Sequence, residues 1–354
     1  MLDDLKKISD LDRGHILAAI ERLPGQIRQA WNEVKLVDIP QAYFEAKNVV
    51  VSGMGGSGLG ARVVRYLMFD RLRVPIEYVN QYLVPNYVND TTLVIISSYS
   101  GNTEETIAST YSALKKNARV VGMTTGGKLG ELFKKENLPC WLFEPRENPS
   151  GQPRMGLGYS IAGTLAILAK CQFLSLEENE IKELIESSEG FVKEFGVRVA
   201  TKENLAKKLA LNYASKIPIL FSAEHLVGVS HAFRNQINEN SKTFSGNYKI
   251  SEANHHLMEG LKFPAKAKDV VRFLIFESPL YYEKIQKRFG ITEDILAKNG
   301  YGFDVYKTTA KNKLSEAFEV LILGSYISFY LAILHGIDPS PIPWVDYFKE
   351  KMDN

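Results

Sequence analysis

The sequence predicts an α/β fold with two doubly wound, parallel-sheet lobes that are joined by helices and followed by a C-terminal helical tail. Three observations predict this class. Short, continuous apolar runs alternate with helical stretches, as is typical of parallel strands covered on both faces. The alternation occurs at 48–135 and resumes at 217–306. The chain has 354 residues, which at roughly 150 residues per domain is enough for about two domains.

The first lobe is predicted from three apolar runs, each followed by a helical stretch. The predicted strands are 48–52, 92–97 and 118–122, and the predicted helices are 57–68, 103–115 and 128–135. Residues 14–36 carry apolar side chains at helical spacing and predict one or two leading helices. After the proline- and glycine-containing segment 149–153, helices are predicted at 158–175 and 177–212.

The strand–helix pattern resumes in the second half of the chain. Strands are predicted at 217–221, 270–276 and, from a weaker pattern, 303–306, and helices at 228–240 and 313–335. His225 and His231 lie where the first of these strands turns into its helix, and the sequence assigns them no role. A proline-rich break at 339–343 precedes a short final helix. The predicted domains are N-terminal helices at 1–40, a first lobe at 41–155, connecting helices at 156–200 and a second lobe with its tail at 201–354.

Composition and charge exclude several classes of protein. Apolar residues make up 45% and charged residues 24% of the chain, which excludes a disordered or fibrous protein. The 43 basic and 41 acidic side chains nearly balance, so we expect neither a nucleic acid nor a membrane as partner. There is no run of 18 apolar residues and no apolar signal segment at the start, so a cytoplasmic location is expected. Cys140 and Cys171 lie in apolar surroundings and are expected to be buried and inert.

A glycine-rich segment, Gly53-Met-Gly-Gly-Ser-Gly58, lies directly between the first predicted strand and the helix after it. Glycines allow a tight turn and let a ligand approach the backbone, and a helix N-terminus offers unpaired N–H groups to an anion. The segment lacks the Gly-x-Gly-x-x-Gly spacing of a dinucleotide-binding loop, and no P-loop lysine follows it. It therefore indicates either a phosphate-binding loop or an ordinary tight turn.

A second polar loop, 97–106, follows the strand predicted at 92–97 and opens the next helix. Ser98, Ser100 and Thr103 lie within six residues, and such hydroxyl groups bind phosphate oxygens without a lysine or arginine. An ordinary capping box accounts for one of these hydroxyls but not for three. Because the carboxyl ends of parallel strands meet at one edge of a sheet, we expect both loops to form one phosphate site there.

These two loops resemble the sugar isomerase (SIS) domain, a doubly wound α/β module that binds phosphorylated sugars. Four later motifs resemble the bifunctional phosphoglucose/phosphomannose isomerases: QPRMGLGYS at 152–160, FRNQINENSK at 233–242, EANHH at 252–256 and DPSPIPWVDYFKEKM at 338–352. The resemblance runs from about residue 45 to the end of the chain. It implies that the substrate phosphate is bound by Gly56, Ser57, Ser98, Ser100 and Thr103.

Isomerisation of a sugar phosphate moves a proton between C1 and C2, and it needs a base, an acid–base group for ring opening and a cation near the enediolate. The resemblance implies that Glu239 is the base, acting through a cis-enediol, and that His255 opens the ring. It also implies a homodimer in which this histidine is donated across the subunit boundary. The family usually has Glu-x-Asn-His-Asn here. This chain has His256 in the last position, so His256 is the alternative to His255.

Two basic residues and one hydroxyl complete the implied site. Arg154 would stabilise the enediolate, and the alternative is a surface arginine that links the lobes. Lys349 would assist ring opening, and its neighbour Lys351 is the alternative. Ser340, where many relatives have threonine, could contact the sugar.

The resemblance implies an enzyme that interconverts glucose 6-phosphate and mannose 6-phosphate with fructose 6-phosphate, without a metal or another cofactor. A metal site at His255, His256 and Glu259 is an alternative, but only His255 and Glu259 have i,i+4 spacing and no third ligand is evident. Two other functions remain open: an isomerase for one sugar only, and a regulator that binds a sugar phosphate without reaction. The joint presence of Glu239 and His255 favours an enzyme.

Overall fold

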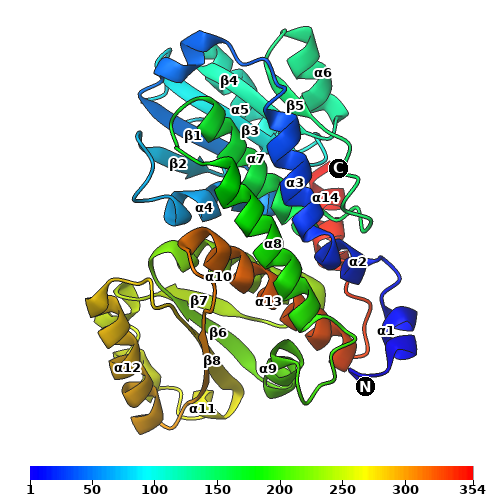
Figure 1. Ribbon diagram of the computed structural model, residues 1–354, viewed down its shortest axis with the longest axis vertical. Helices are drawn as coiled ribbons and strands as arrows, with labels where there is room; N and C mark the ends of the chain where they lie inside the picture. Colours follow the sequence, from blue (N-terminus) through cyan, green and yellow to red (C-terminus); the bar gives the residue numbers. More distant parts are fainter. Residues whose placement is uncertain (354) are drawn as a thin grey trace. The chain divides into compact units, whose positions relative to one another are not determined.

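The computed structural model describes residues 1–353, which form two compact units (Figure 1). One unit is Arg22–Glu186, and the other combines Met1–Glu21 with the part of the chain that begins at Ser187. Each unit contains one sheet, and all paired strands in both sheets are parallel. The predicted α/β class with two parallel-sheet lobes is therefore confirmed.

The sheet of the Arg22–Glu186 unit has the strand order β2-β1-β3-β4-β5. Its strands are β1 (Asn48–Gly53), β2 (Ile76–Val79), β3 (Thr92–Ser98), β4 (Arg119–Thr124) and β5 (Cys140–Leu142), and its helices include α3 (Leu23–Val34), α4 (Gly55–Leu67), α5 (Glu104–Lys115), α6 (Gly127–Lys135) and α7 (Leu157–Lys170). The three predicted strands are β1, β3 and β4, and they are almost fully buried. The edge strands β2 and β5 are short and partly exposed, so they carry no continuous apolar run and were not predicted.

Helices cover both faces of this sheet. The helix α4 connects β1 to β2, toward one edge of the sheet, whereas α5 and α6 connect β3 to β4 and β4 to β5, toward the other edge. Because such crossovers are right-handed, α4 lies on one face of the sheet, and α5 and α6 lie on the opposite face. On the α5 and α6 face, Val50, Val94 and Val120 from adjacent strands pack with Phe133 in one apolar cluster. On the other face, α4 packs against α7, which in turn packs against α3. Burial of both faces explains why each central strand contains a continuous apolar run.

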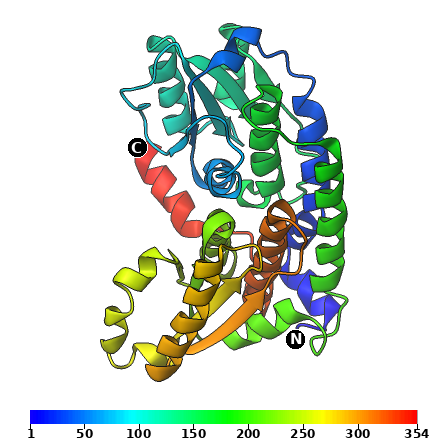
Figure 2. The same ribbon diagram turned by 60° about the vertical axis from the view of Figure 1, so that its left-hand side comes forward.

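The sheet of the second unit has the order β7-β6-β8-β9. Its strands are β6 (Ile217–Ser222), β7 (Gly246–Lys249), β8 (Val271–Glu277) and β9 (Gly302–Lys307), and its main helices are α9 (Leu205–Tyr213), α10 (Val227–Ser241), α12 (Glu283–Lys298) and α13 (Lys313–Leu334). Figure 2 shows α12 and α13 on opposite sides of this sheet. The strand β7 and the helix α12 were not predicted, because both are largely polar and exposed. The other helices of the chain are α1 (Leu5–Leu11), α2 (Ile16–Glu21), α8 (Glu178–Phe195), α11 (Ala267–Val270) and α14 (Pro343–Asp353).

The helix α13 is the central core element of the second unit. Its 22 residues have a mean hydropathy of 1.9 in the most apolar window, so by length and composition alone it could cross a membrane. However, 94% of that window is buried inside the structure, where α13 packs against α10 and α9. It is the buried core helix of this unit, in agreement with the long apolar helix predicted at 313–335.

The N-terminal segment is attached to the second unit by a buried lysine. Lys207 has no exposed side-chain surface, and its Nζ donates to Asp3 Oδ1 (2.9 Å) and to the carbonyls of Val197 and Val199 (both 2.8 Å). The bond to Lys207 lowers the pKa of Asp3. These three acceptors satisfy the ammonium group, which is the condition for burying its charge.

The two cysteines are unpaired, as predicted. Burial raises the pKa of Cys140 and of Cys171 to about 12, so both thiols stay protonated at neutral pH. Cys171 is buried as expected, whereas Cys140 is only partly buried.

Two carboxylates lie close together at the carboxyl end of β8. Glu277 ends the strand, and Lys307 Nζ lies 3.2 Å from its Oε2. Burial, together with the neighbouring Glu277 carboxylate, raises the pKa of Glu293 to about 7, and the charge of Lys307 opposes this rise.

We predict that Glu293 lowers the stability of the folded protein as pH rises from 4.5 to 7. In the Glu293→Gln variant this pH-dependent loss should be absent. An acid whose pKa is raised by folding destabilises the folded state as pH rises from its unfolded pKa, here 4.5, to its folded pKa of about 7. Glutamine stays neutral at every pH. Since Glu293 is partly exposed, solvent screening reduces the effect to about 1 kcal/mol, or about 2–4 °C in Tm. Thermal unfolding of both proteins should therefore give equal Tm values at pH 4 and a higher Tm for the variant at pH 8. Parallel curves over this range would contradict the assignment.

Candidate active site

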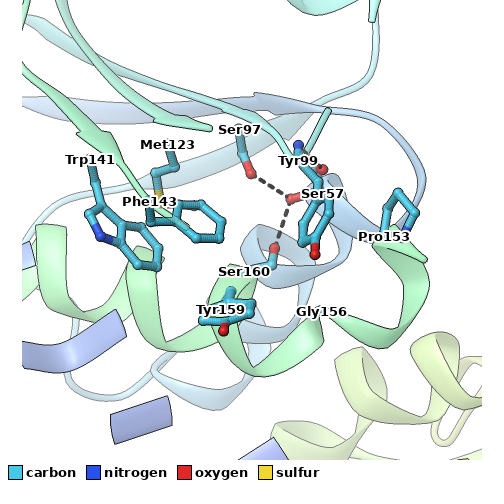
Figure 3. A pocket seen from close by; sticks show the side chains of 11 residues that line it. Ser57, Ser97, Tyr99, Met123, Trp141, Phe143, Pro153, Gly156, Tyr159 and Ser160 are labelled. Atoms are coloured by element: carbon cyan, nitrogen blue, oxygen red, sulfur yellow. Dashed lines mark hydrogen bonds between the residues drawn. The ribbon is translucent and has the colours of Figure 1, made fainter. Parts of the chain in front are cut away.

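The glycine-rich segment forms the turn from β1 into α4. Ser57 lies in the first turn of α4, and its Oγ accepts a hydrogen bond from the backbone N–H of Tyr99 (2.8 Å). Its carbonyl oxygen accepts from the hydroxyls of Ser97 (2.9 Å) and Ser160 (2.8 Å), which Figure 3 shows as dashed lines. The two predicted loops therefore contact each other directly.

The second loop leads from β3 into α5, with Thr103 as the N-cap residue. Ser98 Oγ donates to Thr103 Oγ1 (3.2 Å), and Ser100 Oγ accepts from the N–H of Asn102 (3.3 Å). In these bonds Ser57, Ser100 and Thr103 act as acceptors only. Within residues 1–353, the protons of these three hydroxyls therefore remain available to an external acceptor.

Both loops lie at one edge of the sheet, as predicted. The strands β1 and β3 are neighbours, and Gly53 pairs in register with Ser97, so the two loops begin side by side. The first turns of α4 and α5 add backbone N–H groups and the positive ends of two helix dipoles. This arrangement of hydroxyl and N–H donors suits the oxygens of a phosphate group.

Arg154 is held against the first loop. It lies in the short 3-10 helix η2 (Pro153–Met155), and a Cβ atom at Gly56 would lie 2.6 Å from the carbonyl oxygen of Pro153. Only glycine therefore allows the Arg154 turn to pack this closely on the loop. Arg154 is 3% exposed, and its Nη1 donates to Gln152 Oε1 (2.8 Å). The alternative of a surface arginine is wrong.

A buried glutamine of α3 anchors the chain on both sides of Arg154. Gln26 has no exposed surface; its Nε2 donates to the carbonyls of Glu147 (3.0 Å) and Met155 (2.9 Å), and its Oε1 accepts from the N–H of Gly158 (3.1 Å). These bonds join residues more than 120 positions apart in the chain. Gln26 was not predicted from the sequence. A polar residue among the apolar positions of a predicted helix was the only signal for it.

An aromatic pocket lies beside the first loop (Figure 3). It is lined by Gly56, Ser57, Ser97, Tyr99, Met123, Trp141, Phe143, Pro153, Gly156, Tyr159 and Ser160. Trp141 and Phe143 stack with ring centroids 4.1 Å apart. Asn148 Nδ2 donates to the hydroxyl of Tyr99 (2.8 Å), and burial raises the pKa of Tyr99. These rings form a rigid apolar support for the polar edge above the sheet.

Glu239 lies in the last turn of α10 and is half-buried. Gln236 Nε2 donates to Ser325 Oγ (3.0 Å), and Asn240 Nδ2 donates to Ser328 Oγ (3.1 Å), which fixes one face of α10 on α13. Because residues on a helix advance by about 100°, Glu239 lies about 60° around the helix axis from Gln236 and about 100° from Asn240, at the border of that face. These two bonds fix the position of the last turns of the helix, and thereby the backbone that carries Glu239.

His255 and His256 are both exposed, at the end of the 3-10 helix η4 (Glu252–His255). The turn is anchored by Asn254, whose Nδ2 donates to Thr292 Oγ1 on α12 (2.9 Å). The ring of His256 lies 6.3 Å from that of Tyr248. Within residues 1–353, no three His, Cys, Asp or Glu side chains are arranged to hold a metal, so His255, His256 and Glu259 do not form such a set.

The remaining residues predicted for the site lie near the C-terminus. Lys349 is exposed on α14, and the Nζ of Lys351 lies 5.6 Å from the ring centroid of Tyr347. Ser340 is buried, and a Cβ at Gly14 would lie 1.8 Å from its Oγ, so this serine packs closely on the N-terminal segment. The roles of these residues stay predictions.

The structure places the two histidines that the sequence analysis left unassigned. His225 is buried, and its Nε2 lies 2.6 Å from Glu316 Oε2. His231 lies on α10, and its Nε2 is 2.9 Å from Nη2 of Arg234.

Comparison with known proteins identifies relatives along the whole chain. Residues 42–129 match the family model of the SIS domain, and residues 202–352 match the bacterial phospho-glucose isomerase C-terminal SIS domain. The bifunctional phosphoglucose/phosphomannose isomerase of Caldicellulosiruptor bescii is 31% identical over 94% of this chain and 98% of its own. The protein of the same name from Thermoplasma acidophilum is 28% identical over 86% of this chain and 89% of its own.

A solved structure is similar in fold. The C-terminal domain of glucosamine-fructose-6-phosphate aminotransferase from Francisella tularensis matches with a TM-score of 0.73 and covers 92% of this chain and 98% of its own. At 15% identity, this likeness supports the fold alone.

We predict that Gly56→Ala weakens phosphate binding. The new methyl group would meet the Pro153 carbonyl at 2.6 Å and push the Arg154 turn away from the loop. We expect the Kd for inorganic phosphate, measured by calorimetry, to rise at least about tenfold, equivalent to about 1.4 kcal/mol.

The matched control is Gly130→Ala, in the interior of α6. Its added Cβ would make only ordinary contact, 3.5 Å from Leu142. Alanine favours a helix over glycine by about 1 kcal/mol, so this variant should keep phosphate affinity and not lose stability. Equal phosphate affinities in the two variants would show that the close packing at Gly56 is not required for binding.

Proposed function

The chain belongs to the bifunctional phosphoglucose/phosphomannose isomerase family and is a phosphosugar isomerase, and from that premise we propose its substrates. It interconverts glucose 6-phosphate and mannose 6-phosphate with fructose 6-phosphate, through a cis-enediol and without a metal. The observation that carries this proposal is the meeting of two hydroxyl-rich loops with the buried Arg154 turn at one edge of the first sheet.

The phosphate end of the substrate is held by the first unit. The hydroxyls of Ser57, Ser100 and Thr103 and the N–H groups near Gly56 bind the phosphate oxygens, and Ser98 orients Thr103 through its hydrogen bond. The guanidinium of Arg154 stabilises the negative charge that develops on the enediolate. A buried arginine fixed by Gln152 is preorganised for this task, because little side-chain freedom remains to be lost.

The proton transfers are assigned to the second unit. His255, assisted by Lys349, moves the proton that opens the sugar ring, since imidazole is suited to acid–base work near neutral pH. The carboxylate of Glu239 then takes the proton from C2 of the aldose and returns it to C1, while the hydroxyl proton passes from O2 to O1, which gives the ketose. Ser340 contacts the sugar.

One base serves both aldoses. Glucose 6-phosphate and mannose 6-phosphate differ only in configuration at C2, and C2 becomes planar in the enediol. A site that accepts both orientations of the C2 hydroxyl therefore converts both sugars to the same intermediate. An isomerase for one sugar only is the second candidate. Such an enzyme would use the same base, but its site would accept only one orientation of the C2 hydroxyl.

We further propose a homodimer in which each copy donates His255 to the other. The exposure of His255 and His256 at the end of an anchored turn supports this, because an acid–base group needs a defined partner. A C2 dimer would supply two equivalent sites.

The experiment that tests the function is a coupled assay of purified protein with each aldose phosphate, in the presence and absence of a chelator. We expect chelator-resistant formation of fructose 6-phosphate from both sugars. Glu239→Gln should lower kcat for both by about 10²–10⁴-fold, since it removes the base, while fructose 6-phosphate still binds. The control is Glu283→Gln, an exposed glutamate of α12, which should leave kcat unchanged.

Other outcomes would assign the chain differently. Turnover of one sugar alone would support the narrower isomerase. Loss of activity in the chelator would contradict the metal-free mechanism. Binding without turnover of either sugar would support the regulator.

We predict that His255→Asn and His256→Asn differ. The first removes the ring-opening group and should lower kcat about 10²-fold, whereas the second restores the residue usual in the family and should leave kcat within about twofold. The reverse result would transfer the role to His256. Coexpression of Glu239→Gln and His255→Asn chains tests sharing of the site. If the histidine comes from the partner, the mixed dimer keeps one intact site and recovers about half of the wild-type rate.

A further inference from the structure

The two sheets have corresponding strands, but the polar groups at their carboxyl edges have different hydrogen-bond partners. The order β2-β1-β3-β4 in the first unit matches β7-β6-β8-β9 in the second, and every neighbouring pair is parallel. The loops after β6 and β8 thus correspond to the loops after β1 and β3, which carry the proposed phosphate site. In α/β sheets this edge is where ligands bind.

In the second unit, a donor from the end of each central strand bonds to one carboxylate. Glu316 Oε2 lies 2.6 Å from His225 Nε2, which follows β6, and 2.6 Å from the hydroxyl of Ser278, which follows β8. Glu316 Oε1 accepts from the hydroxyl of Thr308, which follows β9, at 2.7 Å. Three loops therefore converge on a side chain that comes from α13.

These bonds use the donors fully. The Ser278 oxygen also accepts from the N–H of Leu280 (2.9 Å), so its only proton is directed to Glu316. Within residues 1–353, the other ring nitrogen of His225 has no hydrogen-bond partner, so Glu316 is the only polar group that orients this imidazole. Glu316 itself has no exposed surface.

The next carboxylate on α13 makes a similar set of contacts. Glu319, one turn later, accepts from the hydroxyl of Tyr306 (2.7 Å) and from the N–H groups of Thr309 and Ala310 (both 2.9 Å). An apolar core helix thus directs two carboxylates at the edge of the sheet where N–H and O–H donors gather.

We propose that the carboxyl edge of the second sheet is an anion-binding site that the chain fills with its own Glu316 carboxylate. In the first sheet the corresponding hydroxyls of Ser57, Ser100 and Thr103 keep their protons for an external anion. In the second sheet the donors already bond to the Glu316 carboxylate of the same chain. Removal of the Glu316 side chain beyond Cβ opens a site for a small carboxylate, and acetate has the size and charge of the CH2–COO⁻ group that is lost. The comparison with substrate phosphate rests on the proposed function, but the acetate site does not.

The test is chemical rescue of Glu316→Ala. The variant and the wild type are each unfolded, refolded and melted in sodium acetate or in sodium chloride at equal ionic strength and pH 7. We expect the Tm of the variant to rise by several degrees in acetate, saturably with its concentration, because a ligand that binds only the folded state stabilises it. The wild type should melt at the same temperature in both salts. Adding Thr308→Val to the variant should reduce the acetate effect.

Two results would overturn the proposal. One is a folded Glu316→Ala variant with equal Tm values in acetate and chloride. The other comes from Glu316→Gln, which keeps the shape and decides the case if the alanine variant folds in neither salt. A bound carboxylate predicts a lower Tm for Glu316→Gln, whereas relief of an unneeded buried charge predicts an unchanged or higher Tm.

Stoichiometry separates this proposal from the proposed function. Calorimetry of the wild type with fructose 6-phosphate should give one site per chain, and two would contradict a second edge that is filled from within. If no sugar phosphate binds, the proposed function fails, while acetate rescue still supports the Glu316 site.

Discussion

The close approach of the Pro153–Arg154 turn to Gly56 is the constraint on which the first unit's site depends. No side chain other than hydrogen fits between the loop and the Pro153 carbonyl, so the glycine decides whether a buried arginine can approach the glycine-rich loop. Two amide side chains then hold the Pro153–Arg154 turn in this position. Gln26 bonds to the chain on both sides of the turn, and Asn148 connects it to the ring of Tyr99 in the second loop. Uncharged amide groups thereby hold the turn that carries this charged side chain.

Both sheets need acceptors for the hydrogen-bond donors at their carboxyl edges, and the two sheets obtain them in different ways. In both sheets of this protein, N–H and O–H donors from the loops gather at the carboxyl edge, and burial of such groups without acceptors is unfavourable. In the first unit we propose that a ligand accepts from these donors, and in the second unit Glu316 and Glu319 accept from them. This explains why α13, apolar enough to resemble a membrane span, carries two carboxylates with no exposed surface.

Much of the fold could be predicted from the sequence because strands buried on both faces carry continuous apolar runs. β1, β3 and β4 illustrate this, and the polar loops after β1 and β3 identified the candidate phosphate site. Elements without that signal were missed: β2, β5 and β7 at sheet edges, and the largely exposed α12. The burial of Arg154 and the role of Gln26 also could not be predicted, because both depend on contacts between segments more than 90 residues apart. The pairing of His225 with Glu316 spans 91 residues and has the same cause.

The turn that carries the two histidines shows which part of a motif a fold must keep. Asn254 bonds to Thr292 and accepts from Arg288 on α12, so its amide determines where the turn lies. The side chains of His255 and His256 project from that turn into solvent and contribute little to its position. A change from asparagine to histidine at 256 therefore leaves the bonds of Asn254 intact. Its effect is limited to the contacts of the exposed imidazole ring. For this reason the register of the motif, set by Asn254, is a better guide to the acting imidazole than the number of histidines beside it.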